Sequence, residues 1–136
     1  MPFMAWNDRL VLGIKGIDSD HKKLVEMINE LYDGIEAGRG RETLTGILGR
    51  LVDYSRYHFA REEALFAETG SPRAAEHKKE HDTMAAVVTR AQADYLKSGT
   101  VAPSLEMIVI LKDWLFDHIL GSDQRDIQYL KGNGIE

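Results

Sequence analysis

Apolar residues recur every three or four positions along four long stretches of this chain. Glycine, proline and serine separate these stretches, at Gly38-Arg39-Gly40, Thr69-Gly70-Ser71-Pro72 and Ser98-Gly99. Such a period places the apolar side chains on one face of an α-helix. Four helices of this kind with short connections favour an all-α fold, an antiparallel up-down-up-down four-helix bundle.

The same punctuation gives the expected helix ends. The predicted helices run from a cap at Asp18 and Ser19 to Gly38, from Glu42 to Ala67, from Ser71 and Pro72 to Leu96, and from Pro103 and Ser104 to an interruption at Gly121. A short amphipathic C-terminal helix containing Ile127 and Leu130 follows. The side chains expected to face inward include Leu24, Ile28, Leu31, Leu44, Leu48, Leu51, Met84, Val88, Leu105, Ile108, Leu111 and Leu115.

The first residues lack any helical period. Residues 1–17 therefore predict an extended N-terminal arm, packed over the bundle through Phe3, Trp6, Leu10 and Leu12. The whole chain, 1–136, has the size of one domain, since domains usually span about 100–200 residues. We expect a single domain with an arm at one end and a short helix at the other.

Composition excludes several classes of function. Lys and Arg total 17 against 22 Asp and Glu, and a net charge of -5 argues against nucleic acid as a partner. The absence of cysteine excludes disulfides, Cys-ligated zinc and iron–sulfur clusters. No apolar run approaches the roughly 18 residues of a membrane span. No secretory signal is visible at the N-terminus, so we expect a cytoplasmic protein.

All five histidines fall on the inward faces of the predicted helices; they are His21, His58, His77, His81 and His118. About three positions in seven of a bundle helix face inward, so chance would place all five there in roughly 1–2% of cases. Five neutral imidazoles in one small core would leave many ring nitrogens without partners. A metal ion supplies those partners, and the pattern therefore predicts a metal site.

Two carboxylates extend this pattern. Glu62 lies four residues after His58, one turn along the same face, and a buried carboxylate without a partner is energetically expensive. Asp123 follows His118 by five residues, which leaves it about 140° from the histidine's face in an α-helix. A π-bulge, or a break at Gly121, would bring the two side chains together.

Other acidic residues lie next to the histidines in the sequence. Glu63 points away from the face of Glu62 and is expected to be solvated. Caps or solvent-facing charges are the roles expected for Asp18, Asp20, Glu76 and Glu80. The predicted metal ligands are His21, His58, Glu62, His77, His81, His118 and Asp123.

These ligands are too many for one zinc ion, which usually takes four. They suit two first-row metal ions, and the carboxylates favour iron or manganese. We hypothesise that Glu62 and Asp123 each give one oxygen to each metal, and that a solvent-derived oxo or hydroxo group also bridges the pair. Each metal then has three oxygen ligands, and the five histidines must divide as three and two.

Which histidines bind which metal is a hypothesis, because the sequence alone does not fix the division. His77 and His81 are four residues apart on one helix and can hold the same metal, which His118 would complete to six ligands. His21 and His58 would bring the other metal to five ligands and leave one position open. An open position is what reversible capture of a small molecule requires.

A family resemblance rests on the order and spacing of seven residues: His21, His58-x-x-x-Glu62, His77-x-x-x-His81 and His118-x-x-x-x-Asp123. This pattern resembles the signature of the hemerythrins over essentially the whole chain. The length and the arm with Trp6 resemble the single-domain bacterial members, the bacteriohemerythrins.

The resemblance implies an oxo- or hydroxo-bridged, non-haem di-iron centre that binds O2 reversibly, with the same three-and-two division of histidines. It implies a protein for oxygen carriage, storage or delivery, not an enzyme, and leaves a protein acceptor of O2 open as a partner. Leu115 matches a leucine of the family's O2 pocket, although its spacing fits an ordinary core residue equally well.

Other functions stay open. In a sensor, O2 or the redox state would change contacts with a partner; a chain of 136 residues leaves no room for a signalling domain, which favours a carrier. In a di-iron oxidase, peroxidase or nitric-oxide-handling enzyme, the centre would turn over substrate. Ferritin-like oxidases use more carboxylates, with Glu-x-x-His motifs, whereas this set is rich in nitrogen. A structural metal site fits least, because structural sites are usually closed.

Overall fold

The computed structural model describes residues 2–136, and every element of regular secondary structure in that range is a helix. The elements are a 3-10 helix η1 (Asp8–Leu10), α1 (Lys15–Glu36), α2 (Arg41–Glu68), α3 (Ala74–Ser98), α4 (Leu105–Asp117), a π-helix η2 (His118–Asp123) and α5 (Gln124–Gly132). Of these helices, none combines the length and the apolar character that a bilayer-spanning segment needs.

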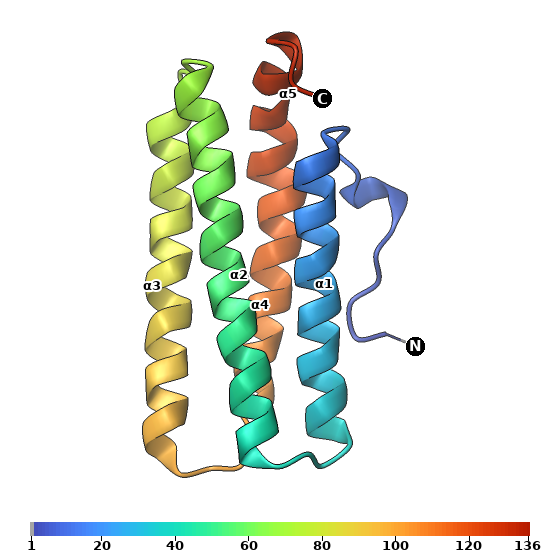
Figure 1. Cartoon of the computed structure of the whole chain (residues 1–136), viewed down its shortest axis with the longest axis vertical. Coiled ribbons are helices and arrows are strands. Elements are labelled where there is room, and N and C mark those ends of the chain that lie inside the picture. Colours follow the sequence, from blue (N-terminus) through green and yellow to red (C-terminus); the bar gives the residue numbers. More distant parts are fainter. Residues whose placement is uncertain (1) are drawn as a thin grey trace.

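The four long helices, α1 to α4, run alternately up and down side by side (Figure 1). The connections α1–α2 and α3–α4 lie at one end of the bundle and α2–α3 lies at the other, while η2 and α5 continue the path of α4. This arrangement confirms the predicted all-α, antiparallel four-helix bundle with a short C-terminal helix.

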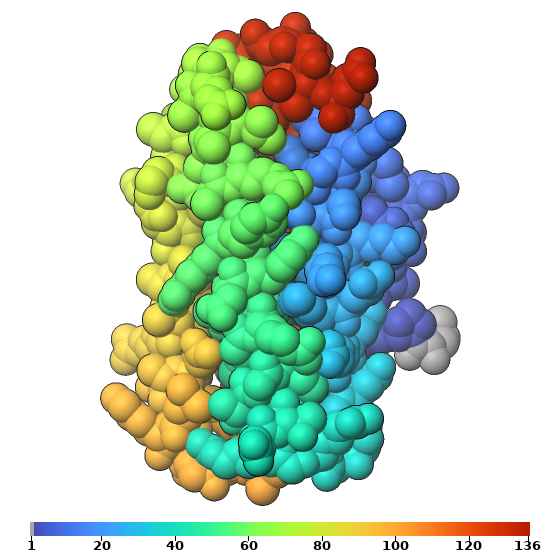
Figure 2. Space-filling model, viewed as in Figure 1, coloured from blue at the N-terminus to red at the C-terminus, as the bar shows by residue number. Residues whose placement is uncertain are grey.

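The core lies between the helices, each of which packs against two neighbours. On the face shown in Figure 2, side chains of α1, α2 and α3 close over the interior. The buried apolar residues include Leu24, Ile28, Leu31, Leu44, Leu48, Leu51, Met84, Val88, Ile108, Leu111 and Leu115. Burying one leucine fully stabilises the fold by about 1.5–3 kcal/mol, so this stripe supplies much of the driving force.

One residue of the predicted stripe faces outward. Leu105 is 52% exposed, and Met107 and Leu111 take the inward positions at the start of α4. Two residues turn an α-helix by about 200°, so Leu105 and Met107 cannot share a face. The inward orientation predicted for Leu105 is therefore wrong.

The N-terminal arm packs along α1 as predicted (Figure 1). Its buried residues are Met4, Leu10, Leu12 and Ile14, and Phe3 and Trp6 pack against the core while half-buried. The backbone of Met4 exchanges two hydrogen bonds of 2.8 Å with the side-chain amide of Asn29 on α1. These two bonds fix the arm's position against α1.

The first helix begins at Lys15, three residues before the predicted cap. The carboxylate of Asp18 accepts hydrogen bonds from the amides of Leu12 (2.7 Å) and Gly13 (3.0 Å), so it caps the turn of the arm. Gly13 has a φ of 97°, which glycine adopts without steric cost. The prediction of a helix start at Asp18 is wrong because its carboxylate binds the arm's amides.

Serine has different roles at the starts of the next two helices. Ser104 is the N-cap of α4, as predicted, and its Oγ accepts from the amide of Met107 at 3.2 Å. The third helix begins at Ala74, three residues after the predicted Ser71 cap. Ser71 Oγ accepts from the amide of Arg73, which belongs to the non-helical turn before α3. The predicted start was therefore too early by a few residues.

Candidate metal centre

Seven side chains from α1, α2, α3 and the α4–η2 segment meet inside the bundle. Each is at most 5% exposed; they are His21, His58, Glu62, His77, His81, His118 and Asp123. They form two groups, and within each group the ligand atoms all lie within 4.8 Å of one another. The structure thus brings together every residue that the sequence pattern selected.

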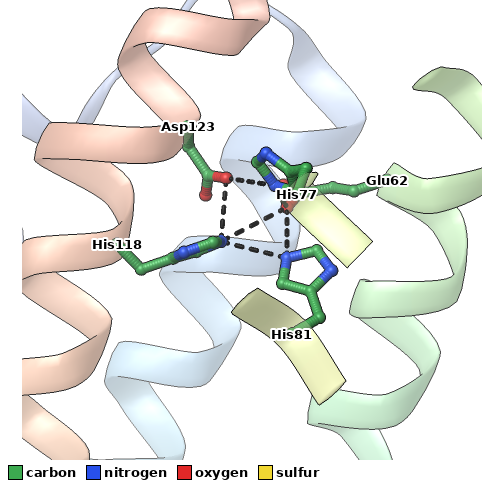
Figure 3. A group of neighbouring side chains, drawn as sticks. All are labelled: Glu62, His77, His81, His118 and Asp123. Atoms are coloured by element: carbon green, nitrogen blue, oxygen red, sulfur yellow. Dashed lines mark hydrogen bonds and ion pairs between the residues drawn. The ribbon is translucent and has the colours of Figure 1, made fainter. Parts of the chain in front are cut away.

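The larger group, hereafter the three-histidine group, consists of Glu62, His77, His81, His118 and Asp123. Figure 3 shows these side chains pointing toward one another. The Nε2 atoms of His77 and His118 each lie 2.9 Å from Asp123 Oδ1. His81 Nε2 lies 3.0 Å from His118 Nε2 and 3.4 Å from Glu62 Oε1.

The second, two-histidine group consists of His21, His58 and the same two carboxylates, Glu62 and Asp123. Glu62 Oε2 lies 3.3 Å from His58 Nε2, and Asp123 Oδ2 lies 3.1 Å from His21 Nε2. Glu62 Oε1 and Asp123 Oδ1 contact the histidines of the other group. Each carboxylate therefore turns one oxygen toward each group, which is the arrangement of a bridging ligand.

Helix geometry explains this convergence. Residues four apart share a helical face, which aligns His58 with Glu62 on α2 and His77 with His81 on α3. His118 and Asp123 are five apart, and the π-helix His118–Asp123 brings them onto one side. Of the two predicted ways to join this pair, the π-bulge is confirmed.

Most inward-facing atoms of the site have no aligned hydrogen-bond partner within residues 2–136. They include Nε2 of His21, His58 and His77 and both carboxylate oxygens of Glu62 and Asp123. Each buried polar group left without a partner costs about 1–3 kcal/mol. A metal ion would satisfy several of these atoms at once, and imidazole nitrogens with carboxylate oxygens are a donor set that suits iron.

Without a metal ion the site holds opposite charges. Burial opposes the charge on His58, but Glu62 and the hydrogen bond to Asp20 outweigh it and raise the pKa of His58 to about 10. Burial likewise opposes the charge on His77, but contacts with Asp123 and Glu62 raise its pKa to about 11. Burial favours the neutral form of Glu62, yet the facing histidines hold its pKa well below the usual value.

Two aspartates outside the predicted ligand set are buried beside the histidines. Asp20 is 2% exposed and accepts a hydrogen bond from His58 Nδ1 at 3.0 Å. Asp126 is 3% exposed and accepts one from His77 Nδ1 at 2.9 Å. The expectation that Asp20 caps a helix or faces solvent is wrong, and Asp126 was not predicted to lie at the site. Each lies four residues before a buried leucine of its own helix, and that spacing was the available signal.

Two glutamates approach the outer sides of the remaining two histidines of the three-histidine group, His81 on α3 and His118 at the start of η2. A Glu63 oxygen lies 3.4 Å from His81 Nδ1, and a Glu80 oxygen lies 3.7 Å from His118 Nδ1. Their side chains are 21% and 38% exposed, so Glu63 is only partly solvated and Glu80 partly faces solvent. Glu76 is on the surface, as expected, and pairs with an arginine.

An apolar cavity of about 30 Å³ lies between the helices, and none of the seven clustered side chains lines it. Phe59 and Trp114 line it, and their rings stack on His81 and His118 with centroids 4.2 Å and 4.6 Å apart. Leu115, which is 3% exposed, also lines the cavity. The cavity can hold one small molecule, since a single water needs about 10–15 Å³ of such space.

Comparison with known proteins points to one family. The profile of the hemerythrin HHE cation binding domain matches residues 12–130. The chain is 32% identical to a bacteriohemerythrin of Stenotrophomonas maltophilia, over 98% of this chain and 85% of that protein. It is 35% identical to a bacteriohemerythrin of Pseudomonas aeruginosa, over 90% of this chain and 78% of that protein.

A solved structure agrees with these relatives. The crystal structure of a leucine-to-alanine mutant of hemerythrin superimposes with a TM-score of 0.87. It is 27% identical in sequence and covers 96% of this chain and 98% of its own. The bundle, the cluster of histidines and carboxylates, and the matched profile lead to one conclusion: this chain belongs to the hemerythrin family.

Proposed function

We propose that this protein binds O2 reversibly at a pair of iron ions, for oxygen carriage, storage or delivery. The observation that carries the proposal is the orientation of Glu62 and Asp123, each of which turns one oxygen toward each group of histidines. The bacteriohemerythrin relatives and the buried donor atoms without aligned partners support it.

The seven side chains would hold the irons unequally. Besides the shared carboxylates, one iron would have three histidine ligands and the other only His21 and His58. This difference in donor number favours O2 binding on the two-histidine side. When bound, the two iron ions supply the electrons that O2 takes up on binding and returns on release.

The protein's own contribution is to position the ligands and to exclude water. Leu115, Phe59 and Trp114 line the apolar cavity, Phe59 and Trp114 also stack on His81 and His118, and we assign this cavity to O2. Water entering it would carry protons to the centre and favour irreversible oxidation of the irons. Leu115 therefore acts, in this proposal, as part of the wall that keeps the site dry.

The donor set favours binding over catalytic turnover. Five imidazoles and two carboxylates make the site rich in nitrogen, whereas ferritin-like di-iron oxidases use more glutamates. Neutral imidazoles stabilise Fe(II) relative to the highly oxidised states that oxidation of a substrate needs. We therefore propose a carrier and not an enzyme.

The test combines metal analysis with optical spectra recorded through repeated removal and addition of O2. We expect two iron ions per chain and an O2-dependent visible absorption band that appears and disappears reversibly. A band that bleaches irreversibly, with release of an oxidised product, would instead indicate an enzyme. Protein that binds no iron after anaerobic loading would contradict the proposal.

A further inference from the structure

In two of the histidines, the ring nitrogen Nδ1, which points away from the other ligands, faces a buried carboxylate. His58 Nδ1 donates to Asp20 at 3.0 Å and His77 Nδ1 donates to Asp126 at 2.9 Å. His58 belongs to the two-histidine group and His77 to the three-histidine group. Each half of the site therefore has one fully buried carboxylate behind one of its histidines.

We propose that Asp20 and Asp126 are positioning residues, which hold His58 and His77 with Nδ1 protonated and Nε2 aimed into the site. This inference rests on the proposed metal centre. A carboxylate accepts hydrogen bonds but cannot donate them when ionised, so it selects the ring form that carries the proton on Nδ1. Only Nε2 is then available as a metal ligand, and the hydrogen bond fixes the plane of the ring.

Both carboxylates are also held from the outside of the bundle. Asp20 accepts from the Tyr54 hydroxyl at 2.8 Å and lies 3.4 Å from Arg61 Nε. These partners tie the carboxylate to α2, the helix that carries His58. A carboxylate bonded on both sides has little freedom to move, and so it can impose an orientation on the ring.

Asp126 has a parallel set of contacts. Its Oδ1 accepts from Arg73 Nε at 2.8 Å and from Arg125 Nε at 2.9 Å, while Oδ2 accepts from His77. The arginines keep this carboxylate ionised despite its burial, and its pKa is accordingly lowered. The two arginines thus compensate the negative charge of Asp126 on the side of the carboxylate that faces away from His77.

The two halves depend on these aspartates to different degrees. In the three-histidine group, His81 and His118 also have glutamates near Nδ1, at 3.4 Å and 3.7 Å. In the two-histidine group, His21 Nδ1 is buried and has no hydrogen-bond partner among residues 2–136. Asp20 is therefore the sole outer carboxylate of its group within that range, and its loss should weaken metal binding more than the loss of Asp126.

The experiment compares Asp20→Asn and Asp126→Asn with a matched control, Asp82→Asn. Asp82 also lies next to a histidine in the sequence, but it is exposed and pairs with Lys78 at 2.8 Å. All three changes remove one negative charge and keep the size of the side chain. Anaerobic titration with Fe(II) against a competing chelator gives the two stepwise affinities of each variant.

We expect Asp20→Asn to weaken the lower-affinity step by about 10–100-fold, because outer partners of metal-bound histidines typically contribute this much. Asp126→Asn should weaken the higher-affinity step, toward the lower end of that range, and Asp82→Asn should change neither. Tyr54→Phe, which removes one bond to Asp20 and leaves its charge, should produce a smaller loss at the same step as Asp20→Asn. Wild-type affinities in Asp20→Asn and Asp126→Asn would overturn the inference.

A second readout does not require metal. In metal-free wild-type protein, the Nδ1–H protons of His58 and His77 should give NMR signals protected from exchange with water, whether the rings are neutral or charged. Asp20→Ala should remove the protection of the His58 proton alone, and Asp126→Ala that of the His77 proton alone, because alanine offers no acceptor in place of the carboxylate. Unchanged protection would overturn the inference. Failure of wild-type protein to bind Fe(II) would instead overturn the proposed function.

Discussion

At the scale of single residues, Glu62 and Asp123 distinguish one shared centre from two unrelated metal sites. Their oxygens are divided between the two groups of histidines, so a change at either carboxylate should affect both metals. A change at one histidine should affect mainly the group to which it belongs. This difference can be measured directly.

The first prediction compares Glu62→Gln with His58→Ala. Glu62→Gln should lower the content of both metals, because the amide nitrogen cannot act as a ligand in place of a carboxylate oxygen. His58→Ala should bring the iron content below two per chain while the three-histidine group keeps its metal. Metal analysis after anaerobic loading checks both, with the surface change Glu76→Gln as control. Two irons retained in His58→Ala would show that the ligand set is wrong.

The second prediction concerns the cavity. Leu115→Ala enlarges the apolar cavity and should admit water, so the O2-bound protein should convert severalfold faster to an oxidised form that no longer binds O2. The optical spectrum followed over time measures this rate. Leu44→Ala is the control, because Leu44 is buried and does not line the cavity, and both variants should lose about 2–5 kcal/mol of stability. An unchanged rate in Leu115→Ala would remove Leu115 from the pocket wall.

Residue-level patterns predicted the seven clustered side chains and missed the carboxylates behind them. The histidines stood out because they are few and because all of them follow the apolar stripes. Asp20 and Asp126 lie on inward faces too, four residues before Leu24 and Leu130. Their burial depends on partners distant in sequence, Tyr54 for Asp20 and Arg73 for Asp126, which no local spacing indicates.

At the scale of elements, the π-helix is the least ordinary feature of the fold. It spans His118–Asp123 and includes Gly121, at which an added Cβ would meet no atom within 4 Å. A π-turn accommodates one more residue than an α-turn, and here that residue aligns a histidine and an aspartate five positions apart. The π-helix thus brings Asp123 to the same side as His118 and completes the cluster of seven side chains.

The third prediction tests this register. Deletion of Gly121 would place the carboxylate four residues after His118, on the same face of an ordinary α-helix, and metal content should be retained. Insertion of an alanine after Gly121 would rotate Asp123 about the helix axis by about 100° more, away from the other ligands, and metal content should fall. Metal analysis and circular dichroism of both variants check this. Equal losses in both would show that helical register does not position Asp123.

Helix ends were predicted less well than helix faces. The start of α2, after Gly40, and the Ser104 cap, which accepts from the amide of Met107, lie close to their predicted places. Asp18 and Ser71 instead bond to amides of the adjoining loops, and the helices begin at Lys15 and Ala74. A capping residue shows that the chain turns nearby, but the local contacts decide which amide it binds.

At the scale of the whole molecule, metal binding and folding are linked through protons. In the metal-free protein, the pKa values of His58 and His77 are about 10 and about 11, above the 6.5 of an ordinary histidine. The folded state therefore binds these protons more tightly than the unfolded state. Their contribution to stability is complete below the unfolded pKa and is lost as the pH rises through the folded values.

The fourth prediction follows from that sign. The free energy of unfolding of the metal-free protein should fall as the pH rises from about 7 to about 10. Metal must displace the same protons, so the gain in stability from bound metal should grow over that range. Denaturant unfolding with and without metal measures both trends. A metal-free protein that becomes more stable over this interval would contradict the charge state inferred for the site.

The proposed centre requires two metal ions within one ring of seven side chains. Diffraction from crystals of the iron-loaded protein, recorded at the iron absorption edge, locates those ions directly. We predict two anomalous peaks per chain, one against His77, His81 and His118 and the other against His21 and His58, with Glu62 and Asp123 touching both. A single peak, or peaks outside this ring, would contradict the account.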